Sequence, residues 1–276
     1  MSVITNEEIL AELQPLTLMD DLFMRIFFKD NIPCAQIMLR VILNKPKLIV
    51  RSVKVQYVLK GGDDSHYVRL DMWADDYDGT QYDTEFQNVS SGASPQRARY
   101  NSAILDANIL KPKEDYSVLK KRESVVIFIT DKDVLGEGEP IYFIDRVILK
   151  SGKKFNDGSH IVYVNTSHQD LSTELGRLVH DLKCVKPEEM LDPVFAEKAE
   201  ETKGGTVMGV WEEMESEAEA RGEARGEARG EARGKAIAAE NIALNFIKAG
   251  KAALDEVASI CGLTLQRVEE LANTVR

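Results

Sequence analysis

Hydrophobic and polar side chains alternate along two neighbouring runs, residues 66–76 and 80–88, with the period of two that is typical of β-strands. Successive side chains of a strand point to opposite faces, so each run is predicted to have one mostly apolar face. The apolar positions are Val68, Leu70, Met72, Ala74, Tyr82, Thr84 and Phe86, and the other face carries Tyr67, Arg69, Asp71, Trp73, Gln81, Asp83, Glu85 and Gln87.

The turn between the two strands decides which residues face each other. A two-residue Asp78-Gly79 turn would pair Asp71 with Phe86 and mix the two faces, because opposed residues of an antiparallel pair share a face. A three-residue loop, 77–79, with Gly79 in the left-handed conformation, pairs Asp71 with Glu85. We therefore predict the second register, which also pairs Arg69 with Gln87.

Two carboxylates side by side on a strand pair suit a divalent cation, since buried acids are costly unless a cation neutralises them. Asp71 and Glu85 are the predicted ligands, with Mg²⁺ as the expected ion and Mn²⁺ as an alternative. The spacing alone is equally compatible with a solvated face of an antiparallel sheet.

The remaining hydrophobic pattern predicts an α/β domain. Helices are expected at 17–29, 32–44, 94–110 and 170–183, and further strands at 48–59, 124–130, 141–150 and 160–165. The apolar, β-branched run at 124–130 is typical of a strand that is covered on both faces.

Several sequence blocks, in order, resemble the Rpn family of recombination-promoting nucleases and transposases, which belongs to the PD-(D/E)XK nuclease superfamily. The blocks are LTLMDDLFMRIFFKDN, RLDMWADDYDGTQYDTEFQ, SPQRARYNSAILDANIL, SVVIFIT and PIYFIDRVIL, and the resemblance covers residues 15–195. It implies a restriction-endonuclease-like core, in which a mixed central sheet is flanked by helices.

The resemblance also implies roles for individual residues. Asp71 matches the motif aspartate, Glu85 the second acid, and Gln87 the position held by lysine in most of the superfamily. Asp21 and Tyr100 are supporting candidates; Met24 departs from the family pattern, because a lysine often stands there. The implied function is a Mg²⁺-dependent DNA endonuclease that promotes recombination or transfer of mobile elements. The alternative is a nuclease-fold protein that binds DNA or a protein without cleaving.

The residue types agree with phosphodiester hydrolysis. An ion held by two carboxylates can act as a Lewis acid and activate water. Gln87 has no charge, but its amide can orient the water or donate to a phosphate. A hydrogen bond to Arg69 across the strands is the structural alternative for Gln87.

Net charge of −11 argues against indiscriminate nucleic-acid binding, yet basic residues cluster between 94 and 122. Arg97, Arg99, Lys120 and Lys121 are the expected contacts to DNA phosphates. Scattered, solvated lysines are the alternative. A second basic run, Arg146, Lys150, Lys153 and Lys154, contains no acidic residue among its charged positions in 146–154.

Other chemistries lack support in the sequence. The three cysteines, Cys34, Cys184 and Cys261, are widely spaced and form no CxxC pair, and the four histidines show no HExxH spacing. No apolar run reaches the length of a membrane span, and the first residues lack a secretory pattern, so the expected location is the cytoplasm and no membrane partner is expected.

The composition changes after the predicted nuclease domain, 1–195. Residues 196–235 form a charged linker in which EARG is repeated four times at 219–234. Its glycines and its like-charged neighbours four residues apart predict a marginal helix or a spacer. Residues 236–276 have a helix-turn-helix-like pattern with few basic groups, which favours a small module for a protein partner or for homo-oligomerisation over DNA reading.

Overall fold

The computed structural model describes residues 5–60, 67–205, 233–250 and 252–275, together with the single residues 216, 226 and 230. The chain divides into two compact units, residues 1–208 and 209–276, which are described separately. The first unit contains a six-stranded sheet in the order β1-β2-β3-β4-β8-β5. Its strands are β1 Val50–Leu59, β2 Val68–Asp76, β3 Gln81–Gln87, β4 Ser124–Thr130, β5 Ile141–Ile144 and β8 Ser159–Asn165.

The sheet is mixed. Strands β1, β2 and β3 are antiparallel neighbours, β3, β4 and β8 run parallel, and β5 closes the edge antiparallel to β8. Strand β4 lies in the middle, and all seven of its residues are buried, as its continuous apolar sequence predicts. The predicted α/β class with a mixed, helix-flanked sheet is confirmed.

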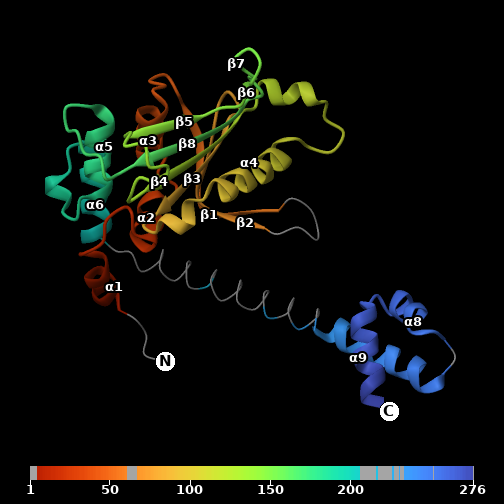
Figure 1. The fold of residues 1–276 in the computed structure, drawn as a ribbon. Helices are drawn as coiled ribbons and strands as arrows, with labels where there is room; N and C mark the ends of the chain where they lie inside the picture. The colour runs from red at the N-terminus through yellow and green to blue at the C-terminus, as the bar shows by residue number, and fades with distance from the viewer. Residues whose placement is uncertain are drawn as a thin grey trace. The chain divides into compact units, whose positions relative to one another are not determined.

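Helices cover both faces of this sheet (Figure 1). The two faces can be followed on β3, where Asp83 accepts a hydrogen bond from Asn101 of α4 and Phe86 packs against Phe28 of α2, with 5.7 Å between ring centroids. Helix α4 therefore covers one face, and α2 lies on the other. The helices are α1 Asn6–Leu13, α2 Asp21–Phe28, α3 Ile32–Leu43, α4 Pro95–Ile109, α5 Glu174–Lys183 and α6 Pro193–Gly204.

The first unit continues past residue 195, where the nuclease domain was predicted to end. Helix α6 packs against α1, α2 and α3. Its Lys203 is 5% exposed, and its ammonium group donates hydrogen bonds to the carbonyl oxygens of Gln14, Leu16 and Val185. These contacts join the end of α6 to the start of the chain.

The predicted hairpin register is confirmed between β2 and β3, where Met72 pairs with Thr84, Trp73 with Asp83 and Asp75 with Gln81. The loop spans 77–79, and Gly79 has a φ of 88°, which favours glycine. The ladder begins at Met72–Thr84, however, so the predicted backbone pairs of Asp71 with Glu85 and of Arg69 with Gln87 are not part of it. The two strands separate at the candidate site.

Strict alternation along β2 also fails near Asp71. Leu70 and Trp73 belong to one buried cluster with residues of α4, although a period of two would place them on opposite faces. On the neighbouring strand, Gln56 has a φ of 52°, a left-handed conformation within β1. The prediction that the alternation continues through Asp71, with one mostly apolar face along the whole of β2, is therefore wrong at this point of the strand.

The strand predicted at 141–150 is interrupted. Strand β5 ends at Ile144, and the chain then forms a separate two-stranded hairpin from β6 Val147–Ile148 and β7 Lys153–Lys154. This hairpin connects β5 to β8.

The second unit is helical where it is described. Residues 233–249 form a helix, followed by α8 Leu254–Cys261 and α9 Leu265–Val275. Gly262 ends α8 with a φ of 66°, and the Thr264 hydroxyl accepts from Arg267 N, which caps the start of α9. Most of the EARG repeat lies outside the described residues. No helix among those described is long and apolar enough to span a membrane.

Candidate active site

Asp71 lies where β2 and β3 separate. Its Oδ2 accepts a hydrogen bond from the backbone N of Phe86, at 3.0 Å. The carboxylate thus takes a donor on β3 just beyond the last backbone pair, Met72–Thr84. A side chain that starts on one strand and bonds to the backbone of the next is held rigidly, because both strands belong to the same hydrogen-bonded sheet.

Glu85 is fully buried on β3. Its Oε2 accepts from the guanidinium of Arg97 and, at 3.3 Å, from Nε2 of Gln87. Its Oε1 is buried without a hydrogen-bond donor from any described residue, as is Oδ1 of Asp83, two positions earlier on the same face of the strand. The site therefore contains carboxylate oxygens with unused capacity.

Burial, together with the charges of Asp83 and Asp71, raises the pKa of Glu85 to about 10, although Arg97 opposes the shift. Burial likewise raises the pKa of Asp83, against the hydrogen bond from Asn101. The pKa of Asp71 is raised by burial, opposed by the Phe86 amide and reinforced by the charge of Asp21. These acids cannot all ionise together at neutral pH unless further positive charge reaches them.

Helix α4 supplies the basic side of the site. Ser94 caps its first turn by accepting from Arg97 N at 3.2 Å, and Asn101 follows Arg97 by four residues on the same helix face. Arg97 Nη1 donates to the carbonyl oxygen of Gly92 at 2.8 Å and to Oε1 of Gln87 at 3.3 Å. Arg97 therefore positions both Glu85 and Gln87.

Gly92 lies against the Gln87 side chain. A Cβ atom at residue 92 would lie 2.0 Å from Oε1 of Gln87, which is closer than atoms can approach. Only glycine leaves room for the amide in this orientation. The side chain of Gln87 forms hydrogen bonds with Glu85 and Arg97. The alternative prediction was a cross-strand hydrogen bond to Arg69, and these contacts differ from it.

Asp21 approaches from the N-terminus of α2 through Gln56. Nε2 of Gln56 donates to Oδ1 of Asp21 at 3.0 Å and lies 3.5 Å from Oδ1 of Asp71. The amide thus joins two carboxylates from different elements, and the charge of Asp21 raises the pKa of Asp71. Arg25, one turn along α2, lies 3.6 Å from Asp21.

Gln56 and Asn101 were not among the site residues predicted from the sequence. Gln56 lies in a strand of alternating apolar residues and has no motif around it, and its left-handed backbone appears only in the folded strand pair. Asn101 follows Arg97 by four residues on a predicted helix, which was a usable signal for a shared helix face.

The donor set fits a hard divalent cation. Asp71 and Glu85 offer carboxylate oxygens, Oε1 of Glu85 is buried without a partner, and the raised pKa values mark a deficit of positive charge. Within the ranges that the structure describes, no three His, Cys, Asp or Glu side chains already have the arrangement of a metal centre. Asp71 and Glu85 are the residues that would hold such an ion, and Glu85 is paired with Arg97 in this structure.

The other predicted DNA contacts lie apart from the acids. Arg99 and Tyr100 are exposed on α4. Lys120 and Lys121 are exposed before β4, beside the first residue of β3, where Gln81 N donates to Glu123 O. About 13 Å of strand separates Gln81 from Glu85, so these lysines are at the opposite end of β3 from the site.

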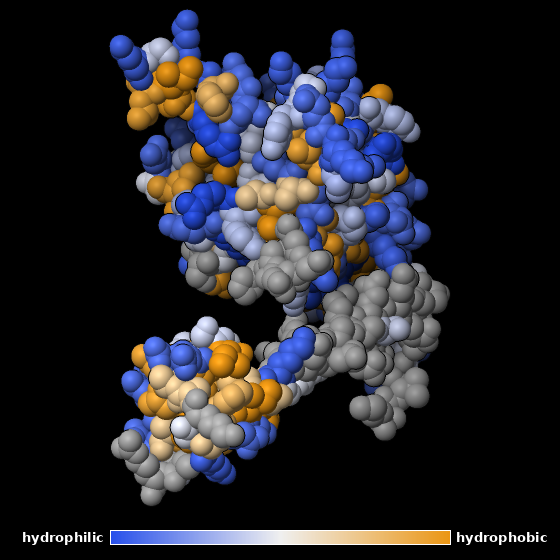
Figure 2. Space-filling model, turned by 90° about the vertical axis from the view of Figure 1, so that its right-hand side faces the viewer, coloured by the Kyte–Doolittle hydropathy of each residue, from blue (hydrophilic) through white to orange (hydrophobic). Residues whose placement is uncertain are grey.

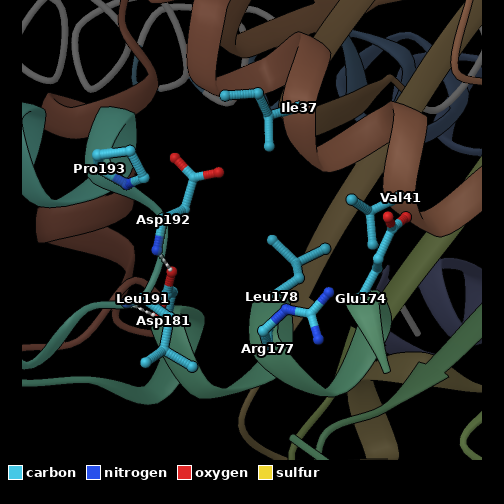
Figure 3. Close-up of a pocket in the computed structure, with 9 residues that line it drawn as sticks. All are labelled: Ile37, Val41, Glu174, Arg177, Leu178, Asp181, Leu191, Asp192 and Pro193. Atoms are coloured by element: carbon cyan, nitrogen blue, oxygen red, sulfur yellow. Dashed lines mark hydrogen bonds between the residues drawn. The ribbon is translucent and has the colours of Figure 1, made fainter. Parts of the chain in front are cut away.

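A concavity of about 260 Å³ between α3, α5 and α6 is lined by three further acids, Glu174, Asp181 and Asp192 (Figure 3). Asp181 is buried, and its two carboxylate oxygens accept from the backbone N of Leu191 and of Asp192, at 2.7 and 2.8 Å. These bonds fix the loop before α6. The carboxylate thus has a structural role, and the residues around Asp71 remain the candidate active site.

No family model matches the chain, and no curated protein or solved structure matches it significantly.

Proposed function

We propose that the first unit is a metal-dependent DNA endonuclease of the PD-(D/E)XK type. The observation that carries this proposal is that Asp71 accepts from the amide of Phe86, next to Glu85 on β3, while Glu85 contacts Gln87 and has one buried carboxylate oxygen without a donor. Asp71 and Glu85 would hold Mg²⁺ or Mn²⁺. The ion, when bound, supplies Lewis-acid activation of water and neutralises developing charge on the phosphate.

The protein residues have separate tasks in this proposal. The Phe86 amide holds Asp71 in its orientation, and Gln56 connects Asp71 to Asp21. The Gln87 amide, fixed by Arg97 and Gly92, is placed to orient a water molecule or to donate to a phosphate oxygen. Arg97, whose side chain is 38% exposed, contributes the positive charge that lysine supplies in most relatives of this type.

A second candidate is a nuclease-fold protein that binds DNA or a protein without cleaving. Two observations favour it: Arg97 already pairs with Glu85, and residue 87 is glutamine. In that case Arg97 and bound protons would permanently satisfy the buried acids.

Plasmid cleavage separates the two candidates. Purified protein is incubated with supercoiled DNA in Mg²⁺, Mn²⁺ or EDTA, alongside Asp71→Asn and the matched control Asp78→Asn, which alters an exposed acid in the turn of the same hairpin. We expect metal-dependent nicking by the wild type and Asp78→Asn, and none by Asp71→Asn. Equal nicking by folded Asp71→Asn would refute the assignment. Absence of nicking in every metal would favour the second candidate.

A further inference from the structure

The hairpin of β6 and β7 is separate from the central sheet. Val147 pairs with Lys154 and Ile148 with Lys153, and Gly152, with a φ of 69°, closes the turn by donating its N–H to Ile148 O at 2.8 Å. Two ion pairs, Arg146 with Asp157 and Lys154 with Asp145, join the two arms at the base. The hairpin is therefore a short ribbon with a braced base.

Apolar side chains of this hairpin are exposed, both at the turn and along the two arms. Leu149 is 92% exposed, Phe155 61%, Val147 49% and Ile148 47%. In the space-filling view, orange side chains bordered by blue ones gather at the top of the first unit, at the height of this hairpin (Figure 2). Contiguous apolar side chains on a surface are unfavourable in water and mark interaction sites.

The charge of the hairpin is opposite to that of the chain. Residues 145–157 contain four basic and two acidic side chains, in a protein with a net charge of −11. Both acids are used by the ion pairs at the base. Lys150 and Lys153 are exposed, and no carboxylate of the described chain lies within 4.0 Å of either ammonium group. Two unneutralised charges thus flank the apolar tip.

Two further lysines lie beyond the base of the hairpin. Ser124 N donates to Gly158 O, so the hairpin leaves the sheet at the end where β4 begins, the end at which Lys120 and Lys121 lie. A concavity of about 490 Å³ between the 3-10 helix Tyr116–Lys120 and the base of the hairpin is lined by Lys120, His160 and the two acids Glu123 and Asp157. Phosphate contacts are therefore expected on the hairpin itself, at Lys150 and Lys153.

We propose that the β6–β7 hairpin is a second contact for duplex DNA, in which the ribbon enters a groove. Lys150 and Lys153 neutralise phosphates on either side, and Leu149 with Ile148 contacts base edges. The proposal rests on the proposed function, because that function makes DNA the substrate. A two-stranded ribbon has the width that the major groove admits, and apolar side chains from such elements contact bases in known binding modes.

Binding is measured by fluorescence anisotropy of a labelled 20-base-pair duplex in EDTA, at several salt concentrations, so that no cleavage is required. Lys150→Gln with Lys153→Gln is expected to weaken binding on the order of tenfold and to reduce the slope of log K against log salt by about 2. Leu149→Ser is expected to weaken binding with the slope unchanged. The control is Lys186→Gln with Lys198→Gln, which removes the same charge from lysines paired with Glu189 and Glu201.

Unchanged affinity and slope in the double variant, or no duplex binding by the wild type, would overturn the inference. The same applies if the hairpin variants lose binding to phosphatidylserine vesicles but retain DNA binding, which would identify a membrane surface. The two proposals can fail separately. Hairpin-dependent binding without any cleavage leaves this inference standing and rejects the nuclease, whereas cleavage with unchanged binding by the double variant rejects the hairpin alone.

Discussion

Replacing Glu85 by glutamine should stabilise the metal-free protein at neutral pH. Glutamine has the shape of the protonated acid and no charge, so it avoids both the burial of a charge and the repulsion from Asp83 and Asp71 that raise the pKa of Glu85. The side chain is fully buried, so the free energy of unfolding responds to its ionisation without screening by solvent. The sign of the effect is therefore the opposite of that expected for an ordinary buried polar residue.

The magnitude follows from the linkage between pKa and stability. The pKa of Glu85 rises from its ordinary value of 4.5 to well above 7 in the folded state, so the folded protein binds the proton more tightly than the unfolded chain. The stabilisation from that proton is complete below about pH 4.5 and is lost as pH rises toward the folded pKa. At pH 7 the loss is about 3 kcal/mol, and at pH 5 about 1 kcal/mol. The Glu85→Gln variant, which does not titrate, should exceed the wild type by these amounts.

Urea unfolding in EDTA between pH 5 and 8 measures this difference. A Trp211→Phe background leaves Trp73 as the one tryptophan, and Trp73 is buried in the first unit. Glu12→Gln, at an exposed glutamate of α1, is the matched control and should show no gap. Added Mg²⁺ should stabilise the wild type and have less effect on Glu85→Gln. Equal stabilities at pH 7, or a gap that does not widen with pH, would refute the reasoning.

Three further substitutions test the packing around the site and of α6. Gly92→Ala would place a Cβ atom 2.0 Å from Oε1 of Gln87, so the amide must move. Plasmid cleavage should fall, while Mg²⁺ should still raise the melting temperature. Unchanged cleavage would show that Gln87 has no part in the reaction. Asn101→Ala removes the donor to the buried Asp83 carboxylate and should lower the free energy of unfolding, measured in urea, by roughly 1–3 kcal/mol. The loss should increase as pH rises, because the ionised form of Asp83 is the one that needs the donor. A loss that does not depend on pH would contradict this. Lys203→Met leaves three carbonyl oxygens without their donor and should lower the free energy of unfolding by roughly 3–5 kcal/mol, as expected for breaking a buried charged network. If the variant is as stable as the wild type, water replaces the ammonium group.

Local rules in the sequence predicted the strands and the hairpin well. Alternation placed β2 and β3, the glycine at residue 79 selected the three-residue loop, and the register of Met72 with Thr84 followed from keeping the faces consistent. These features depend on neighbouring residues only, because side-chain direction in a strand and turn geometry are set within a few positions. The same rules failed at Asp71, where the strands separate and the alternation breaks.

The surroundings of the two acids could not be predicted in this way. Whether Arg97 and Asn101 contact Glu85 and Asp83 depends on how α4 packs on β3, and the position of Asp21 depends on α2 packing on the other side of the sheet. Lys120 and Lys121 belong to the same basic stretch of sequence as Arg97. The chain after α4 nevertheless brings them to the end of β3 that lies away from the candidate site.

The sequence by itself determined the candidate residues for the proposed chemistry: two acids and an amide on adjacent strands, and a helix with arginines soon after them. Only the tertiary structure decided their state, because burial beneath α4 removes the acids from water and thereby raises the pKa values of Asp83 and Glu85. Desolvation depends on every element packed around a group, so it is a property of the assembled fold and not of any short stretch of the chain.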